Sequence, residues 1–153
     1  MSAEEVHDSA TGWVADHIRA YVATDGREGH LHMGWPTLLL TTRGRRSGLL
    51  RRTALIYGQD ADRYLVVASN GGLPDHPAWY LNLGEDPDVT LQVGADKFPA
   101  RARTATLEEK PPLWRVMASI FPQYDVYQAQ SERDIPLVIL DPLMPRPQSG
   151  TVR

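Results

Sequence analysis

The sequence contains no cysteine and, among its 16 basic residues, only two lysines. The lack of cysteine excludes disulfides, thiolate nucleophiles, and zinc or iron–sulfur sites with cysteine ligands. No apolar run approaches the ~20 residues that span a membrane, and the first 15 residues lack the basic start and apolar centre of a signal peptide. We therefore expect a cytoplasmic protein whose 153 residues form one compact unit without a structural metal.

Acidic residues are missing from one basic stretch of the chain. The whole protein has a net charge of −3, but five arginines lie within ten positions that hold no Asp or Glu: Arg43, Arg45, Arg46, Arg51 and Arg52. Such a cluster, without interleaved aromatic residues, favours a discrete anion site over a nucleic-acid surface. Because Arg binds phosphate and carboxylate groups in a bidentate manner, we predict an anionic ligand here and no nucleic-acid partner.

Hydrophobic periodicity predicts hairpins with a few helices. An amphipathic helix is expected at 9–23, where one face carries Ala10, Trp13, Val14, His17, Ile18 and Tyr21. Apolar runs between turn residues predict six strands, at 37–43, 50–57, 64–69, 89–93, 97–104 and 135–140. Further helices are expected at 78–83, 111–120 and 124–130, the second of them after a capping box of Thr106 and Glu109.

The strands follow one another as hairpins rather than as strand–helix–strand units, which argues against a Rossmann sheet. The fold class is therefore α+β and mainly β: a closed or nearly closed barrel of about six antiparallel strands with three to four flanking helices. We expect an N-terminal helix and loop at 1–36, the barrel at 37–142, and a C-terminal tail at 143–153 with few anchoring residues.

A turn bracketed by Gly44 and Gly48 joins the first two strands. Glycines let the backbone approach a ligand closely, so turn amides, the Ser47 hydroxyl and nearby guanidinium groups could converge on one phosphate or carboxylate. The arginines that could contribute are Arg45, Arg46 and Arg51. A solvated hairpin tip with basic edge residues would show the same pattern, so the residues alone leave both interpretations open.

A second segment runs from a strand end at Ser69 through a Gly-Gly loop to a helix that starts at Pro77. A ligand against this loop would meet backbone donors and the positive end of the helix. Trp79, on that helix, is by itself more typical of a core residue.

Tyr124 and Tyr127 are three residues apart, so on a helix they share one face. Two phenols could line an aromatic pocket and donate hydrogen bonds to a substrate oxygen, but a helix that packs its aromatic side on the barrel would show the same spacing. His30 and His32 lack a suitably spaced carboxylate, so no metal site is predicted.

Together and in this order, these segments resemble the deazaflavin-dependent nitroreductase family, whose actinobacterial members use the reduced deazaflavin coenzyme F-420. The resemblance covers about Thr37 to Pro142 and rests on Leu-Leu-Leu-Thr-Thr-Arg-Gly-Arg-Arg-Ser-Gly (38–48), Ala-Ser-Asn-Gly-Gly (68–72), His-Pro-Ala-Trp-Tyr-Leu-Asn (76–82) and Ile-Pro-Leu-Val-Ile-Leu-Asp-Pro (135–142). It implies a split β-barrel of the flavin-reductase type. It also favours the ligand interpretation for the arginine turn and the Ser69 loop.

The resemblance implies roles for individual residues. The arginine turn would hold the phosphate and acidic tail of the coenzyme, through Arg45, Arg46, Ser47 and Arg51. Further cofactor contacts are implied for Thr53, Ala54, Ala68, Ser69, Asn70, Ala78, Trp79 and Asn82. Tyr124 and Tyr127 match positions that line the substrate pocket, and with Ser69 they are our candidate catalytic residues.

The chain departs from the family pattern at three positions near this site. Asn70 stands where the family often has Lys, and Ile56 and Phe121 stand where it has Tyr. These departures are compatible with coenzyme binding but argue against activity on nitroimidazole-type acceptors. The implied activity is transfer of hydride from the reduced coenzyme to a quinone, enone or nitroaromatic acceptor.

Two other functions stay open: an FMN-binding split-barrel oxidoreductase and a non-catalytic carrier of the deazaflavin coenzyme. An acidic oligoglutamate tail accounts for three or more arginines better than a single FMN phosphate does. The expected partner is a small hydrophobic acceptor. If that acceptor is a lipid quinone, the N-terminal helix could contact the inner face of the plasma membrane. The oligomeric state cannot be determined from the sequence.

Overall fold

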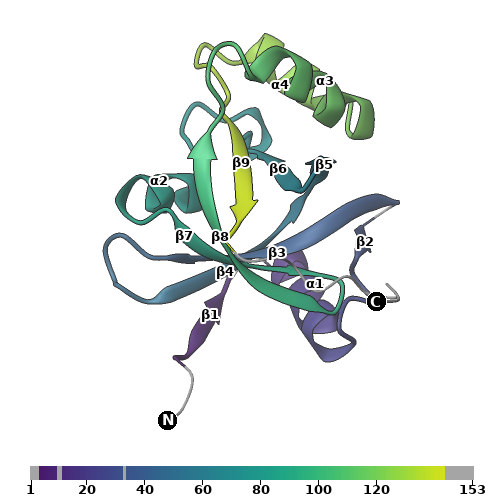
Figure 1. The fold of residues 1–153 in the computed structure, drawn as a ribbon, viewed down its shortest axis with the longest axis vertical. Coiled ribbons are helices and arrows are strands. Elements are labelled where there is room, and N and C mark those ends of the chain that lie inside the picture. Colours follow the sequence, from purple (N-terminus) through teal and green to yellow (C-terminus); the bar gives the residue numbers. More distant parts are fainter. Residues whose placement is uncertain (1–3, 10–11, 33, 144–153) are drawn as a thin grey trace.

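The computed structural model describes residues 4–9, 12–32 and 34–143, which form nine strands, four α-helices and one 3-10 turn (Figure 1). In chain order the elements are β1 (Val6–Asp8), α1 (Gly12–Ala23), β2 (Leu31–His32), β3 (Trp35–Arg43), β4 (Leu50–Ile56), β5 (Gly58–Asp60), β6 (Arg63–Val67), η1 (Asn70–Gly72), α2 (Ala78–Glu85), β7 (Asp88–Val93), β8 (Asp96–Thr104), α3 (Lys110–Ile120), α4 (Gln123–Gln130) and β9 (Leu137–Pro142).

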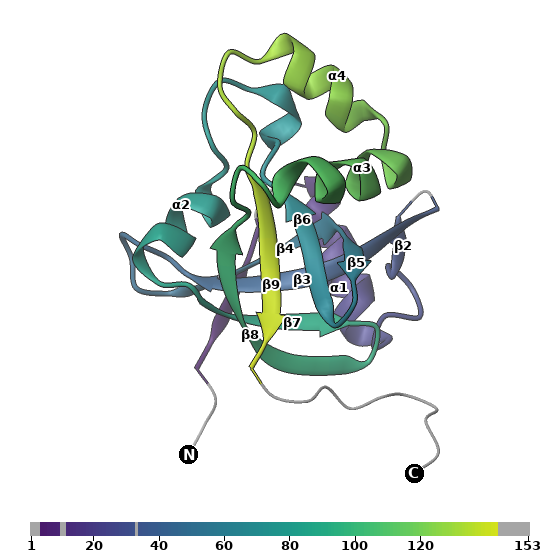
Figure 2. The ribbon, with the colours of Figure 1, turned by 45° about the horizontal axis from the view of Figure 1, so that its top comes forward.

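All these strands belong to one sheet, in the order β1-β4-β3-β7-β8-β9-β6-β5, with β2 paired to β3. Every pairing is antiparallel except that of β1 with β4. The sheet curls, so that β3 and β7 cross β6 and β9 at a steep angle (Figure 2). Within the described residues β1 and β5 remain edge strands, so the sheet is a split barrel rather than a closed one.

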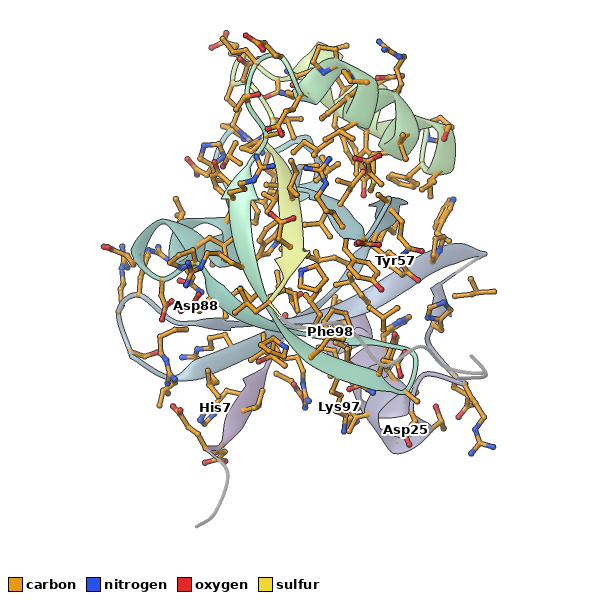
Figure 3. All side chains as sticks on the ribbon, in the orientation of Figure 1. His7, Asp25, Tyr57, Asp88, Lys97 and Phe98 are labelled. Carbon is orange, nitrogen blue, oxygen red and sulfur yellow. The ribbon has the colours of Figure 1, made fainter. Side chains whose placement is uncertain are left out.

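Runs of consecutive apolar residues occur because both faces of the sheet are covered. On β3, Leu38 and Leu40 belong to the inner core of the curl, whereas Leu39 packs against α1 on the other face. The strands β6 and β9 alternate in the same way between the inner core and the cover formed by α3 and α4. Tyr57 and Phe98, which Figure 3 labels, are part of the inner core.

Tyr21 anchors α1 to the sheet. Its side chain is fully buried, and its hydroxyl donates to the carbonyl of Thr37 (3.1 Å) and accepts from the amide of Gly94 (2.7 Å). Burial raises the pKa of Tyr21 to about 12, so the hydroxyl stays protonated at neutral pH. Val14 and Ile18 pack in the same cluster. The apolar face of α1 is therefore part of the core.

The N-terminal segment differs from the sequence prediction. The helix expected at 9–23 begins at Gly12, because Val6–Asp8 pair with β4 and the Ser9 amide donates to the Arg52 carbonyl (2.9 Å). The short strand β2 lies in a segment expected to be a loop. Likewise Gly58–Asp60, between the strands expected at 50–57 and 64–69, forms β5 and pairs with β6.

The remaining elements agree with the prediction within a few residues. The capping box is confirmed, since the Thr106 amide donates to Glu109 Oε1 (2.9 Å) and the Glu109 amide donates to Thr106 Oγ1 (3.1 Å). The helix α3 starts directly after it, at Lys110. Of the predicted tail at 143–153, only Leu143 is described, and the rest lies outside the described residues. In the described part of the chain, no helix is long and apolar enough to cross a membrane.

Candidate functional site

Two neighbouring cavities share part of their walls. The first, of about 550 Å³, lies at the turn between β3 and β4, and the second, of about 420 Å³, is lined by β4, the loop after β6, and α4. Four residues border both of them: Ser9, Thr53, Asn70 and Trp79. An elongated ligand could therefore place one end in each cavity.

The turn between β3 and β4 depends on its two glycines. The Gly48 amide donates to the Gly44 carbonyl (2.9 Å), and the Gly44 amide donates to the Leu49 carbonyl (2.7 Å). Gly48 has a φ of +72°, which favours glycine, and a Cβ on Gly44 would lie 2.7 Å from Ser47 Oγ. Ser47 Oγ also accepts from the Leu49 amide (3.1 Å), so the hydroxyl helps to close the turn.

The N-terminal segment neutralises two of the five clustered arginines. Arg43 forms an ion pair with Glu4, and Arg52 contacts both carboxylate oxygens of Asp8, at 2.5 and 3.2 Å. Among the residues that the structure describes, no carboxylate forms an ion pair with the other three, which all line the first cavity: Arg45, Arg46 and Arg51. The first cavity therefore has a positive charge that an anionic ligand would neutralise.

Asn82, on α2, holds this turn from outside the hairpin. The residue is only 4% exposed, and its Oδ1 accepts from the amide and from Nη1 of Arg45, both at 3.1 Å. Its Nδ2 donates to Thr42 Oγ1 on β3, also at 3.1 Å. Asn82 lines the first cavity, as expected for a cofactor contact, but its side-chain oxygen is engaged by the turn and its side-chain nitrogen by β3.

Aromatic side chains line the second cavity. The Phe121 ring lies edge-on to Trp35 (centroids 4.7 Å apart) and to Tyr124 (4.9 Å), with Tyr127 at 6.3 Å. The strand β4 adds Ile56. Apolar and aromatic walls with few polar groups are typical of sites that bind flat organic molecules.

The two phenols of α4 differ in burial. Tyr124 is only 5% exposed, and its burial, with a smaller effect of Tyr127, raises its pKa well above that of a free tyrosine. The Tyr124 hydroxyl is therefore a hydrogen-bond donor at neutral pH. No hydrogen bond to another described residue engages either hydroxyl. Each phenol can thus donate to an oxygen of a ligand in the second cavity.

The loop after β6 has an unusual backbone. Asn70 has a φ of +49° and Gly72 one of +81°, and the Asn70 side chain donates to the Asp75 carbonyl (3.0 Å). A Cβ on Gly72 would lie 3.1 Å from Cδ1 of Tyr127, so α4 packs closely on this loop. Ser69, at the start of the same loop, lines the second cavity.

The structure brings nearly all of the sequence-predicted site residues to these cavities. Those at the first cavity alone are Arg45, Arg46, Ser47, Arg51, Ala78 and Asn82. Those at the second cavity alone are Ala54, Ser69, Tyr124 and Tyr127, and those at both are Thr53, Asn70 and Trp79. Ala68 is the exception: it lines neither cavity, because its side chain is fully buried at the end of β6 and its amide donates to the Pro136 carbonyl (2.9 Å).

Sequence reasoning missed the contribution of the N-terminal residues. His7, Asp8 and Ser9 line the first cavity, and His17 of α1 lines the second, where its Nε2 contacts the Gly29 carbonyl (2.7 Å). The strand β1 is three residues long and its partner lies more than 40 positions away, so no local pattern could reveal it. The described residues contain no group of three or more His, Asp or Glu placed to hold a metal ion.

The chain is similar to known proteins in both sequence and fold. The sequence pattern of the family described as "F420H(2)-dependent quinone reductase" matches residues 13–142. An F420H(2)-dependent quinone reductase of Mycobacterium tuberculosis is 39% identical over 128 residues, covering 81% of this chain and 86% of that protein. A solved F420-H2 dependent reductase is 36% identical with a TM-score of 0.65, covering 69% of this chain and 94% of the other. A heme storage protein of Vibrio cholerae, 20% identical with a TM-score of 0.52 and covering 71% and 82% of the two chains, shares the fold alone.

Proposed function

Because this chain belongs to the F420H(2)-dependent quinone reductase family, we propose that it is an oxidoreductase that passes hydride from the reduced deazaflavin coenzyme to a quinone. The observation that carries the proposal is the junction of a cationic cavity with an aromatic one through Thr53, Asn70 and Trp79. The coenzyme has the matching form, with an anionic tail joined to a flat redox-active ring.

The donor set of the first cavity fits the tail of this coenzyme. Arg45, Arg46 and Arg51 would bind its phosphate and carboxylate groups through charge-assisted hydrogen bonds, which contribute roughly 1.5–3 kcal/mol each where water is excluded. The small side chains of Ala54 and Ala78 leave room beside the junction for a flat ring. Trp79 borders both cavities and would pack against that ring or its linker.

The bound deazaflavin supplies the hydride, so the protein has to position the acceptor and stabilise the charge that develops on it. Phe121 and Trp35 line the second cavity with apolar surface against which a flat acceptor would pack. Tyr124, Tyr127 and Ser69 would donate hydrogen bonds to the acceptor oxygen, which becomes negative as hydride arrives. Donors fixed in advance stabilise that charge without reorganising.

A quinone suits the second cavity because it is flat and its carbonyl oxygens accept hydrogen bonds. Enones and nitroaromatic compounds share these two properties, so they belong to the proposed range of acceptors. Ile56 and Phe121 line the cavity without offering a hydroxyl, which leaves Tyr124 and Tyr127 as its phenolic donors within the described residues.

The residues that line the two cavities indicate which part of the chain would bind the coenzyme. We propose residues 37–142 as the coenzyme-binding unit, with Ser9 and His17 adding to its walls from the preceding helix and loop region. A cytoplasmic location stays a prediction from the sequence, as does contact with a membrane. Such contact would need a surface other than the buried apolar face of α1.

The test is oxidation of the reduced deazaflavin coenzyme by menadione in the presence of the purified protein. We expect catalysed oxidation with the deazaflavin, and none with NADPH or reduced FMN at the same concentration. Tight binding of the coenzyme without turnover would instead support the carrier function, and turnover with NADPH alone would contradict the proposal.

A further inference from the structure

One arginine outside both cavities holds the loop that carries Ser69. The guanidinium group of Arg133, between α4 and β9, donates to three backbone carbonyls: to Ser69 from Nη2 (2.8 Å), to Ala68 from Nη1 (3.3 Å) and to Leu73 from Nε (3.1 Å). A fourth contact joins Nη1 to Nδ1 of His76 (3.0 Å). All four partners lie in residues 68–76, so a single side chain contacts both ends of this loop, whose Ser69 carbonyl also accepts from the Gly72 amide (2.9 Å).

Arg133 is itself fixed to α4. Its carbonyl accepts from Nε2 of Gln128 (2.9 Å), its amide donates to Ser131 Oγ (3.2 Å), and Gln128 Oε1 accepts from the Ile135 amide (2.9 Å). Gln128 belongs to the helix that carries Tyr124. Arg133 therefore connects two walls of the second cavity, the loop after β6 and α4.

The contact with His76 needs a neutral imidazole, because Nδ1 must accept the hydrogen bond. Partial burial, followed by the nearby charge of Arg133, lowers the pKa of His76, while the Asp75 carboxylate acts in the opposite direction. The ring of Tyr80 packs beside His76, with centroids 4.9 Å apart. At neutral pH the imidazole is thus in the form that the contact requires.

The direction of the Ala68 and Ser69 carbonyls determines which way the next two amides point relative to the second cavity. In a trans peptide, the N–H points opposite to the C=O. Because the carbonyls of Ala68 and Ser69 point toward Arg133, the following amides, those of Ser69 and Asn70, point away from it. No hydrogen bond to another described residue engages these two amides, and both residues line the second cavity.

We propose that Arg133 is a positioning residue, which orients the Ser69–Asn70 backbone so that its two amides serve as hydrogen-bond donors to a ligand in the second cavity. This inference rests on the proposed function for its chemistry. Two fixed amides would add to the phenols of α4 in stabilising an oxygen that becomes negative during reduction. A lysine at this position could not reproduce the role, since one ammonium group lacks the planar fork that reaches three carbonyls.

The experiment compares wild type, Arg133→Ala and Arg133→Lys, with Arg101→Ala as the matched control. Arg101 pairs with Asp88 on the β7–β8 hairpin and touches neither cavity. Hydrogen–deuterium exchange is measured over residues 68–76, together with the Kd of the oxidised deazaflavin and with kcat and KM for menadione. The first two readouts do not depend on turnover.

We expect Arg133→Ala to speed exchange at 68–76 and to lower kcat by about tenfold or more, while the Kd changes by less than about threefold because the arginine turn is intact. Arg133→Lys should lie between wild type and Arg133→Ala in both exchange and kcat. Guanidinium ion at low concentration should restore part of the lost kcat in Arg133→Ala and in no other variant. The Arg101→Ala variant should behave as wild type.

Unchanged exchange at 68–76, or a kcat within about twofold of wild type, would overturn the proposal. If Arg133→Ala does not fold, Arg133→Lys decides by the same readouts. A wild-type protein that neither binds the coenzyme nor reduces menadione would contradict the proposed function instead. The exchange comparison would in that case still test whether Arg133 holds the loop.

Discussion

The side-chain oxygen of Asn82 accepts hydrogen bonds from both the backbone amide and the guanidinium group of Arg45, each at 3.1 Å. One residue of α2 therefore sets both the backbone of the arginine turn and the direction of one of its cations. The same side chain donates to Thr42 on β3, so it links three segments around the first cavity. The shape of the cationic site thus depends on the uncharged side-chain amide of Asn82.

Replacing Asn82 should weaken coenzyme binding even when the substitution removes no charged group. We expect Asn82→Ala to raise the Kd of the deazaflavin coenzyme by about tenfold, because the Arg45 amide loses its partner at a cost of ~1–3 kcal/mol. Asn82→Asp should raise the Kd further at low salt, since it places a carboxylate in the anion site, and the excess should shrink at high salt. Fluorescence titration measures both. A Kd for Asn82→Ala equal to that of wild type would show that the turn holds its form alone.

The arginines themselves should dominate the affinity. The double variant Arg45→Ala, Arg46→Ala should bind the coenzyme well over tenfold more weakly, because two charge-assisted contacts are lost. Arg101→Ala removes an arginine that pairs with Asp88 away from the cavities and serves as the control for loss of an arginine outside the site. A change of less than about twofold in the double variant would remove these residues from the site.

The phenols of α4 should affect turnover rather than coenzyme binding. In the double variant Tyr124→Phe, Tyr127→Phe, we expect kcat for menadione to fall by roughly 10²-fold, as is typical when donors to a developing negative charge are removed. The Kd of the coenzyme should stay close to that of wild type. Steady-state kinetics and titration check the two parts separately, and unchanged turnover would exclude both hydroxyl groups from the mechanism.

The loop after β6 should tolerate no side chain at Gly72. Gly72→Ala combines a φ of +81° with a Cβ 3.1 Å from Tyr127, so we expect a loss of about 1–3 kcal/mol in unfolding free energy. In the matched change Gly84→Ala, within α2, the new Cβ meets no atom within 4 Å, and the variant should gain about 0.5–1 kcal/mol. Urea unfolding of both variants gives the comparison. Equal stability of the two would contradict the described loop geometry.

Glu109 of the capping box should make the free energy of unfolding depend on pH. The hydrogen bond and ion pair of its carboxylate with Arg103, with a further contribution from the Thr106 amide, lower the pKa of Glu109 to about 2. A carboxyl group with a lowered pKa stabilises the folded state above its unfolded pKa of about 4.5, and this contribution is lost as the pH falls toward 2. Glu109→Gln should therefore be less stable than wild type at pH 6. Thermal unfolding at both pH values should show the difference disappearing near pH 2, and a difference that persists there would contradict the assignment.

Local patterns predicted most of the fold because its main strands and helices carry strong signals. The buried run Leu38–Leu40, the glycines of the arginine turn, and the capping box each report a local structure that the chain then adopts. The residues of the arginine turn and of α4 that line the two cavities could be proposed as candidates for the same reason. The resemblance to a known family, rather than the spacing alone, decided between a ligand site and a solvated turn.

What the sequence could not show depends on contacts between distant segments. The strand β1 has three residues, and its place beside β4 is determined by pairing with Leu50–Arg52 and by the contact of Asp8 with Arg52. Arg133 acts on a loop about 60 positions earlier, through backbone carbonyls that any residue type provides. No pattern of residue types records such contacts, so they appear only in the folded structure.

The most direct test of the account is a parallel fluorescence titration of the protein with the deazaflavin coenzyme, with a truncated deazaflavin that lacks the phosphate and acidic tail, and with FMN. We predict that the complete coenzyme binds at least about 10²-fold more tightly than the other two, because only its tail would engage all three uncompensated arginines. Equal affinity for the complete and the truncated deazaflavin, or tighter binding of FMN, would contradict it.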